Sequence, residues 1–336
     1  MSVCRDRMHP RSSLPWGFVT CAVLWTACTP VNGTLIKERD KRYAQRCQAA
    51  PRVMASTQAP RRDRPALIET AVEGFSRESL VLAEILDISS LLERMPTAEA
   101  DAEQKSAGAA LRLMSLRQEV MQALLLASLE ASSASAEVRC EQDRADRLAD
   151  EMEERRSRRY TRLTLTAVIL TALTSVVTGA FTLSGDAVAD GVVAVTGGAL
   201  GGLFGGLALL DADERPFHHP RNHLKEIWEG PDESEVFPGS IWRFLNRRGA
   251  DPDAKSLREQ LVKDWRGKGR LGDRNSDDEQ KRLALLFGEG GSYGIEELRA
   301  RTEMLNELGT TIDLFYEELE RFAHEALGRR PIALDE

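Results

Sequence analysis

The chain has 336 residues and mixed charge, with 45 Lys and Arg against 53 Asp and Glu and a net charge of −8. It lacks the excess positive charge that neutralises phosphates, so no nucleic-acid partner is expected. Its length allows two domains. Aromatic residues are scarce, at 6%, and apolar residues recur at helical spacing along most of the chain. The sequence therefore predicts an all-α fold of long coiled-coil-like helices, a glycine-rich transmembrane hairpin and a small helical C-terminal region.

Residues 1–28 have the pattern of an export signal, in which three arginines precede the short apolar run Trp16–Trp25. The run ends in Leu24-Trp-Thr-Ala-Cys28, which resembles the lipobox of bacterial lipoproteins, where a small residue precedes a cysteine that is lipidated and becomes the N-terminus. Trp25 departs from the family, which usually has Leu at that position. The resemblance implies that Cys28 carries lipid and that the protein reaches the bacterial cell envelope.

Cysteine usage agrees with export. Of five cysteines, two lie within the predicted signal and Cys28 would carry lipid, which leaves Cys47 and Cys140. Neither belongs to a pair with metal-site spacing. In an oxidising compartment they are expected to form a disulfide that closes a loop of about 93 residues, worth about 4–5 kcal/mol in the chain-entropy model. The alternative is two unrelated buried thiols.

Two helices are expected before the centre of the chain. The first, basic and short, covers Thr34–Ala50, and a linker rich in proline and arginine completes a segment over residues 29–65. The second runs from about Ala66 to Arg94, and Pro96 is expected to stop it.

No proline occurs from Thr97 to Leu183, so one very long helix is expected there, capped by Thr97. A break near Ser132-Ser133 is the alternative. Apolar residues follow alternating steps of three and four, interrupted only by Glu141, and this seam requires a closely packed partner helix within a bundle over residues 66–162. The seam consists of Leu124, Ala127, Ala131, Ala134, Val138, Ala145, Leu148 and Met152.

Two charge-free segments, Leu163–Gly185 and Gly191–Leu210, are each about 20 residues long, and as helices they would be ~30 Å long, which matches the apolar core of a bilayer. Small residues recur at every fourth position, a spacing that lets helices approach closely in lipid. We expect a transmembrane hairpin over residues 163–210. A hairpin buried in a soluble core and a conditional inserter are the alternatives. The expected packing residues are Ala167, Thr171, Ser175, Gly179, Gly197, Gly201 and Gly205.

Basic residues immediately precede the first apolar segment and suit lipid phosphates, although a solvated helix face is the simpler interpretation. They are Arg155, Arg156, Arg158, Arg159 and Arg162. The positive-inside rule would place these arginines in the cytoplasm, whereas an exported N-terminus places them outside. We favour export because the signal pattern and the cysteine count agree.

The C-terminal region, residues 211–336, is expected to begin as a loop and continue as short helices with an aromatic core or an aromatic membrane belt. Two of these helices are Ser256–Trp265 and Ser276–Phe287. Gly294–Gly328 is a long amphipathic helix whose apolar residues keep three/four spacing. It is expected to pack antiparallel against the central seam, with self-association as the alternative.

No catalytic, metal or cofactor site is assigned. His218, His219 and His223 lie around Pro220, which favours the first turn of a helix and so keeps His219 outside it. These histidines are expected in a solvated or interfacial loop. The glycine-rich stretch Gly288–Gly294 lacks the Gly-Lys-Ser/Thr ending of a phosphate loop and is expected to be a flexible connector.

The sequence thus favours a non-enzymatic membrane protein of the bacterial envelope with a scaffolding or interaction role. Its expected partners are the lipid bilayer and either itself or another helical envelope protein. The arrangement of long helices around an apolar hairpin also resembles the general layout of α-helical pore-forming toxins. That resemblance implies the alternative, a pore-forming or membrane-perturbing protein, although a permanent lipid anchor argues against a freely secreted toxin.

Overall fold

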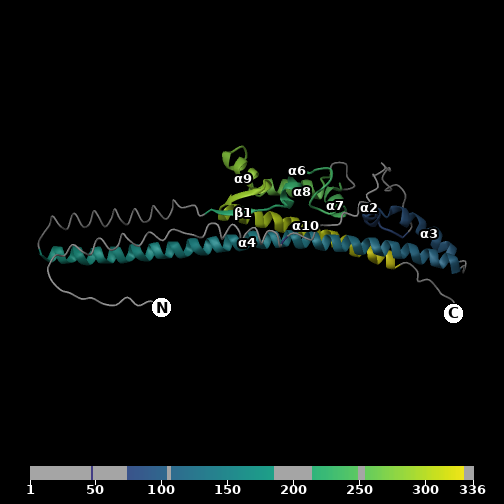
Figure 1. The fold of residues 1–336 in the computed structure, drawn as a ribbon, viewed down its shortest axis with the longest axis horizontal. Coiled ribbons are helices and arrows are strands. Elements are labelled where there is room, and N and C mark those ends of the chain that lie inside the picture. Colours follow the sequence, from purple (N-terminus) through teal and green to yellow (C-terminus); the bar gives the residue numbers. More distant parts are fainter. Residues whose placement is uncertain (1–46, 48–73, 104–106, 185–213, 249–253, 329–336) are drawn as a thin grey trace, which may run out of the picture. The chain divides into compact units, whose positions relative to one another are not determined.

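The computed structural model describes residue 47 and residues 74–103, 107–184, 214–248 and 254–328, and of these it describes the backbone alone at 170, 171, 173–184 and 327. By its internal contacts the chain divides after Arg42, and every described residue belongs to the part that follows. The described residues are mostly helical, which confirms the all-α class in its main point (Figure 1).

The first two described helices are α2 (Arg77–Ile85) and α3 (Ser89–Glu103). The single helix expected through Arg94 is therefore wrong, because the chain breaks at Asp87, which has the left-handed φ of 61°. Pro96 does not stop the helix either and lies inside α3. Burial of its neighbours Met95 and Ala98 offsets the hydrogen bond that proline removes.

Helix α4 runs without interruption from Ala107 to Ser184, 78 residues that span about 117 Å at the usual helical rise. This confirms the very long helix and rejects the break at Ser132-Ser133. Its expected start was wrong, since Thr97 lies inside α3 rather than at the N-terminus of α4.

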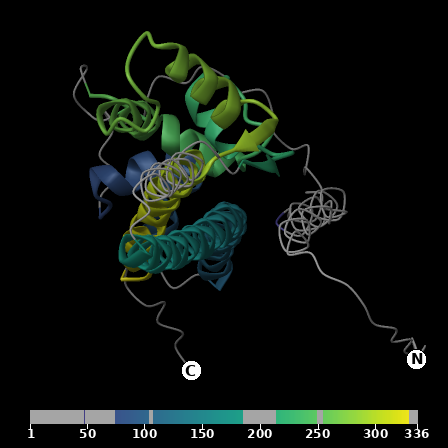
Figure 2. The ribbon, with the colours of Figure 1, turned by 90° about the vertical axis from the view of Figure 1, so that its left-hand side faces the viewer.

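Helix α10 (Ile295–Leu327) returns beside α4 and lies within the expected bounds Gly294–Gly328, with these two glycines as its caps. Ion pairs join Arg299 to Asp150 and Asp313 to Arg139. The later residue of α10 thus contacts the earlier residue of α4, so the two helices run in opposite directions. The antiparallel pairing is confirmed (Figures 1 and 2). Its buried seam contains Ala127, Ala131, Ala134, Val138, Ala145 and Met152 of α4 with Leu298, Leu305, Leu308, Ile312, Phe315 and Phe322 of α10.

The residues between α4 and α10 that the structure describes form what we call the C-terminal subdomain. Its elements are β1 (Arg215–His218), α6 (His223–Glu229), α7 (Gly239–Asn246), α8 (Leu257–Gly267), α9 (Asp277–Phe287) and β2 (Gly290–Tyr293). The two strands pair antiparallel, with Phe217 opposite Gly291. The loop expected at the start of the C-terminal region is thus wrong at Arg215–His218, and the flexible connector expected over Gly288–Gly294 is wrong at Gly290–Tyr293. Gly290 permits the pairing, since it has φ of 104° and a Cβ there would collide with the Phe217 carbonyl.

Aromatic side chains of the subdomain form its core. Of the two alternatives that the sequence left open, an aromatic core and a membrane belt, the structure has the core. Phe237 stacks on Trp242 with ring centroids 5.8 Å apart, and Phe244 lies 4.9 Å from Phe315 of α10. Trp228 stacks on Phe287 at 4.6 Å. These contacts account for the aromatics without a membrane belt.

The membrane predictions fall mostly beyond the described residues. Among the described residues, no helix is both long enough and apolar enough to cross a bilayer. The segment Gly191–Leu210 with Gly197, Gly201 and Gly205 lies outside them, as do Cys28 and the signal. Leu163–Ser184 forms the last part of α4, but nothing is described of the side chains at Thr171, Ser175 and Gly179.

A buried ionic cluster as candidate functional site

The arginines expected at a lipid interface follow Met152, the last buried core residue among the α4 side chains that the structure describes. Arg155 pairs with Glu151 and Arg158 pairs with Glu154, each at 2.6 Å and one helical turn apart. Arg156, Arg159 and Arg162 are exposed on the same stretch. The geometry leaves these arginines accessible to an anionic surface.

The predicted cysteine pair is joined in the structure. Cys47 and Cys140 form a disulfide with Cα atoms 5.4 Å apart. Cys140 lies on α4 one residue before Glu141, the charged residue that interrupts the apolar seam. The disulfide therefore joins Cys47 to α4 beside that charge.

Glu141, the one charged interruption of the seam, is the centre of a buried ionic cluster. Arg301 of α10, which is completely buried, donates from Nη2 to Glu141 Oε1 at 2.5 Å. Arg301 interrupts the apolar stripe of α10 as Glu141 interrupts that of α4. The two charged residues therefore compensate each other across the interface. Charged residues at apolar heptad positions are the sequence signal that could have identified both.

Asn222 connects this pair to the subdomain. It is the N-cap of α6, and its side-chain amide donates to the carbonyls of Leu286 and Gly288 at 2.9 Å each. Its Oδ1 accepts a 3.2 Å hydrogen bond from Arg301. The start of α6, the end of α9 and the middle of α10 are thus held at one point.

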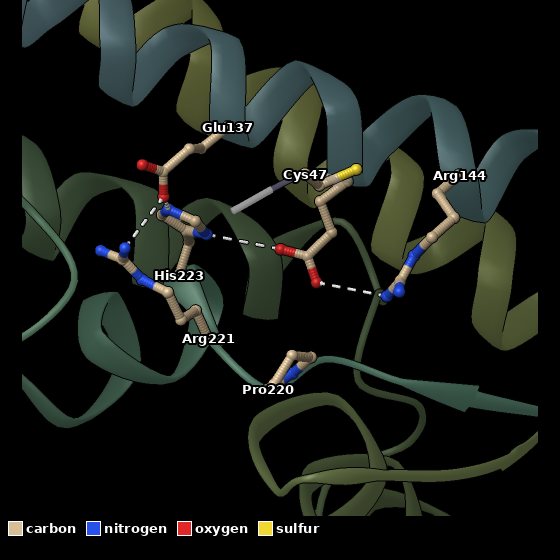
Figure 3. Close-up of a pocket in the computed structure, with 7 residues that line it drawn as sticks. Cys47, Glu137, Arg144, Pro220, Arg221 and His223 are labelled. Carbon is tan, nitrogen blue, oxygen red and sulfur yellow. Dashed lines mark hydrogen bonds and ion pairs between the residues drawn. The ribbon is translucent and has the colours of Figure 1, made fainter. Parts of the chain in front are cut away.

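His223, the first residue of α6, lies between two glutamates of α4 (Figure 3). Its Nδ1 is 3.4 Å from Glu141 Oε2, and its Nε2 is 3.5 Å from Glu137 Oε2. Arg221 Nη1 lies 3.7 Å from the same Glu137 oxygen. The side chains alternate in charge in the order Arg301, Glu141, His223, Glu137 and Arg221.

These contacts shift the pKa values of the buried groups in opposite senses. Burial by itself raises the pKa of Glu141, but the Arg301 charge and the hydrogen bond from His223 outweigh burial and hold that pKa well below its usual range. Burial lowers the pKa of His223, but the carboxylates of Glu137 and Glu141 that face its ring outweigh burial and raise that pKa. Both groups are therefore favoured in their charged forms.

His219, four residues earlier, is a buried histidine in the opposite state. Burial and then the Arg301 charge lower its pKa to about 2, so its ring is neutral. Tyr293 donates its hydroxyl proton to the Leu285 carbonyl at 2.8 Å and accepts from His219 Nε2 at 3.0 Å. Burial raises the pKa of Tyr293 to about 12, so the hydroxyl keeps its proton.

The expectation of a solvated or interfacial histidine loop is therefore wrong for two residues, because His219 is 2% exposed and His223 is 3% exposed. Tertiary contacts with α4 and β2 bury them, and sequence spacing could not reveal those contacts. Within the described ranges, no three His, Cys, Asp or Glu side chains are arranged to hold a metal ion.

The space beside the cluster is small. A pocket of about 20 Å³ lies among Cys47, Glu137, Glu141, Arg144, Pro220, Arg221 and His223 (Figure 3). This volume suits about one water molecule and not an organic substrate, whose pockets measure about 300–1,000 Å³. The cluster thus connects α4, α6 and α10, and the space beside it suits about one water molecule. No protein-family model, curated protein or solved structure matches the chain.

Proposed function

We propose that the protein is a non-enzymatic scaffold or interaction protein of the bacterial cell envelope, held at the membrane by its apolar segments and by lipid on Cys28. The apolar segments over residues 163–210 would form a helical hairpin in the bilayer. The arginines that precede them would contact lipid phosphates.

The observation that carries the proposal is a patch of exposed apolar side chains at the end of α4. Leu165, Val168 and Ile169 are 57%, 60% and 58% exposed. They lie beyond Met152, where the packing of α4 on the core ends, and directly after the exposed arginines. Contiguous exposed apolar side chains require a cover of lipid or protein. Basic residues at one end of the patch favour lipid.

The non-enzymatic part of the proposal rests on the buried cluster. Its charged groups pair with one another, and the adjacent pocket is too small for a substrate. Such a cluster suits the specific joining of helices in a scaffold.

Flotation of the full chain with liposomes that contain anionic lipid, followed by carbonate extraction, tests the proposal. The wild-type protein should float and resist carbonate. Leu165→Asp with Ile169→Asp should reduce flotation severalfold. Leu125→Asp with Leu129→Asp is the matched control, since these residues have the same spacing on α4 and are 62% and 60% exposed. Full release of the wild-type protein by carbonate would reject membrane insertion.

The pore-forming alternative is separated by a second readout on the same liposomes. α4 continues without a break from the helical bundle into the apolar segment, an arrangement that a pore-forming helix would also need. Release of an entrapped dye at protein concentrations that give flotation would favour the pore. Flotation with the dye retained favours the scaffold.

A further inference from the structure

The two nitrogens of His223 each face a buried carboxylate. The His223 side chain is 4% exposed, and those of Glu137 and Glu141 are 4% and 7% exposed. A neutral imidazole has one N–H and can donate to only one carboxylate, while its other nitrogen would direct a lone pair at the second. An imidazolium carries an N–H toward each carboxylate, with Nδ1 3.4 Å from Glu141 and Nε2 3.5 Å from Glu137. The geometry therefore favours the protonated ring.

Arginine side chains lie beside both carboxylates. Arg301 binds Glu141 at 2.5 Å, Arg144 lies 4.0 Å from the same oxygen, and Arg221 lies 3.7 Å from Glu137. The charged and titratable groups around the ring are Glu137, Glu141 and Arg144 from α4, His219 and Arg221 from the segment before α6, and Arg301 from α10.

We propose that His223 is a proton-dependent latch between the C-terminal subdomain and α4. In its protonated form it bridges two turns of α4 and holds the start of α6 against the long helix. After loss of the proton, Glu137 or Glu141 faces a ring lone pair in a space that admits about one water molecule. The repulsion then favours separation of α6 from α4.

The direction of the pH response follows from the sign of the shift. The pKa of His223 is raised in the folded chain above its usual value of about 6.5. Its stabilising contribution is therefore complete below pH 6.5 and is lost as the pH rises through the folded-state pKa. The latch is closed in acid and opens as the pH rises through the folded-state pKa of His223.

Nitrogen-15 NMR of the histidine rings in the full chain tests the protonation state directly. At pH 7 we expect both nitrogens of His223 to carry a proton and its titration midpoint to lie above 6.5. His219 is an internal control, because it should carry a single proton on Nε2 throughout. A neutral His223 ring at pH 7, or a midpoint at or below 6.5, would overturn the proposal.

His223→Gln tests the consequence for stability. Between about pH 6 and 10 the folding equilibrium of the wild-type chain should weaken tenfold more than that of the variant for each unit by which the measured midpoint exceeds 6.5. His324→Gln is the control, since that side chain is 81% exposed on α10. An equal pH response in wild type and His223→Gln would refute the latch. If this variant does not fold, Glu137→Gln should lower the His223 midpoint, and an unchanged midpoint would refute it equally.

Discussion

Removing the Arg301 guanidinium is the most informative perturbation of the buried cluster. In Arg301→Met the ionised Glu141 loses its closest cation, and its carboxylate stays in a buried site, since the Glu141 side chain is only 7% exposed. Breaking one partner of a buried ion pair costs about 3–5 kcal/mol, because the remaining charge is uncompensated. We expect a loss of that size in the free energy of unfolding, measured by urea denaturation of the full chain in mild detergent.

Arg299→Met is the matched control. Arg299 lies two residues earlier on α10 and contacts Asp146, Asp150 and Glu153 of α4, but it is 33% exposed and its partners are 44–62% exposed. Each exposed ion pair contributes about 0–1 kcal/mol, so the control should lose less than Arg301→Met does. Equal losses in the two variants would refute the argument that burial makes Arg301 critical.

A double variant separates charge from packing. Glu141→Leu with Arg301→Met restores apolar residues at both heptad positions, and such replacements of buried pairs are often neutral or stabilising. We expect the double variant to be more stable than either single variant, with a coupling energy of opposite sign to the single losses. A double variant whose loss equals the sum of the single losses would show that the two side chains do not interact.

Three further predictions concern the disulfide, the acid limb of stability and the strand pair. Reduction of the Cys47–Cys140 bond should shift mobility on a non-reducing gel and lower the free energy of unfolding by about 4–5 kcal/mol, the chain-entropy estimate for a loop of this length. The pKa of Glu141 is held below its usual range, so its contribution to the free energy of unfolding is complete above pH 4.5 and is lost as the pH falls. In Glu141→Gln the free energy of unfolding should therefore change less with pH in acid. Gly290→Ala should cost about 1–3 kcal/mol, since its φ is 104° and the new Cβ meets the opposite strand, whereas Gly267→Ala, with no atom within 4 Å, should cost less than about 0.5 kcal/mol in thermal unfolding.

The sequence by itself determined the helical class, the extent of α10 and its antiparallel partner. These follow from local patterns: three/four spacing of apolar residues requires a helix with a buried stripe, and glycines mark both ends of α10. Two complementary stripes of similar length leave few other pairings. The cysteine pair could be predicted for a different reason, since the expected signal and the expected lipidation of Cys28 left only Cys47 and Cys140.

Only the tertiary structure decided which polar residues meet inside the bundle. Arg301 is 160 residues from Glu141 and His223 is 82 residues from it, so no local pattern could indicate their contact. A histidine after a proline has the appearance of a loop residue until α4 covers it. The strand pair depends likewise on residues about 75 positions apart. Burial of a charge is favourable only where a distant partner compensates it, and the fold alone supplies that partner.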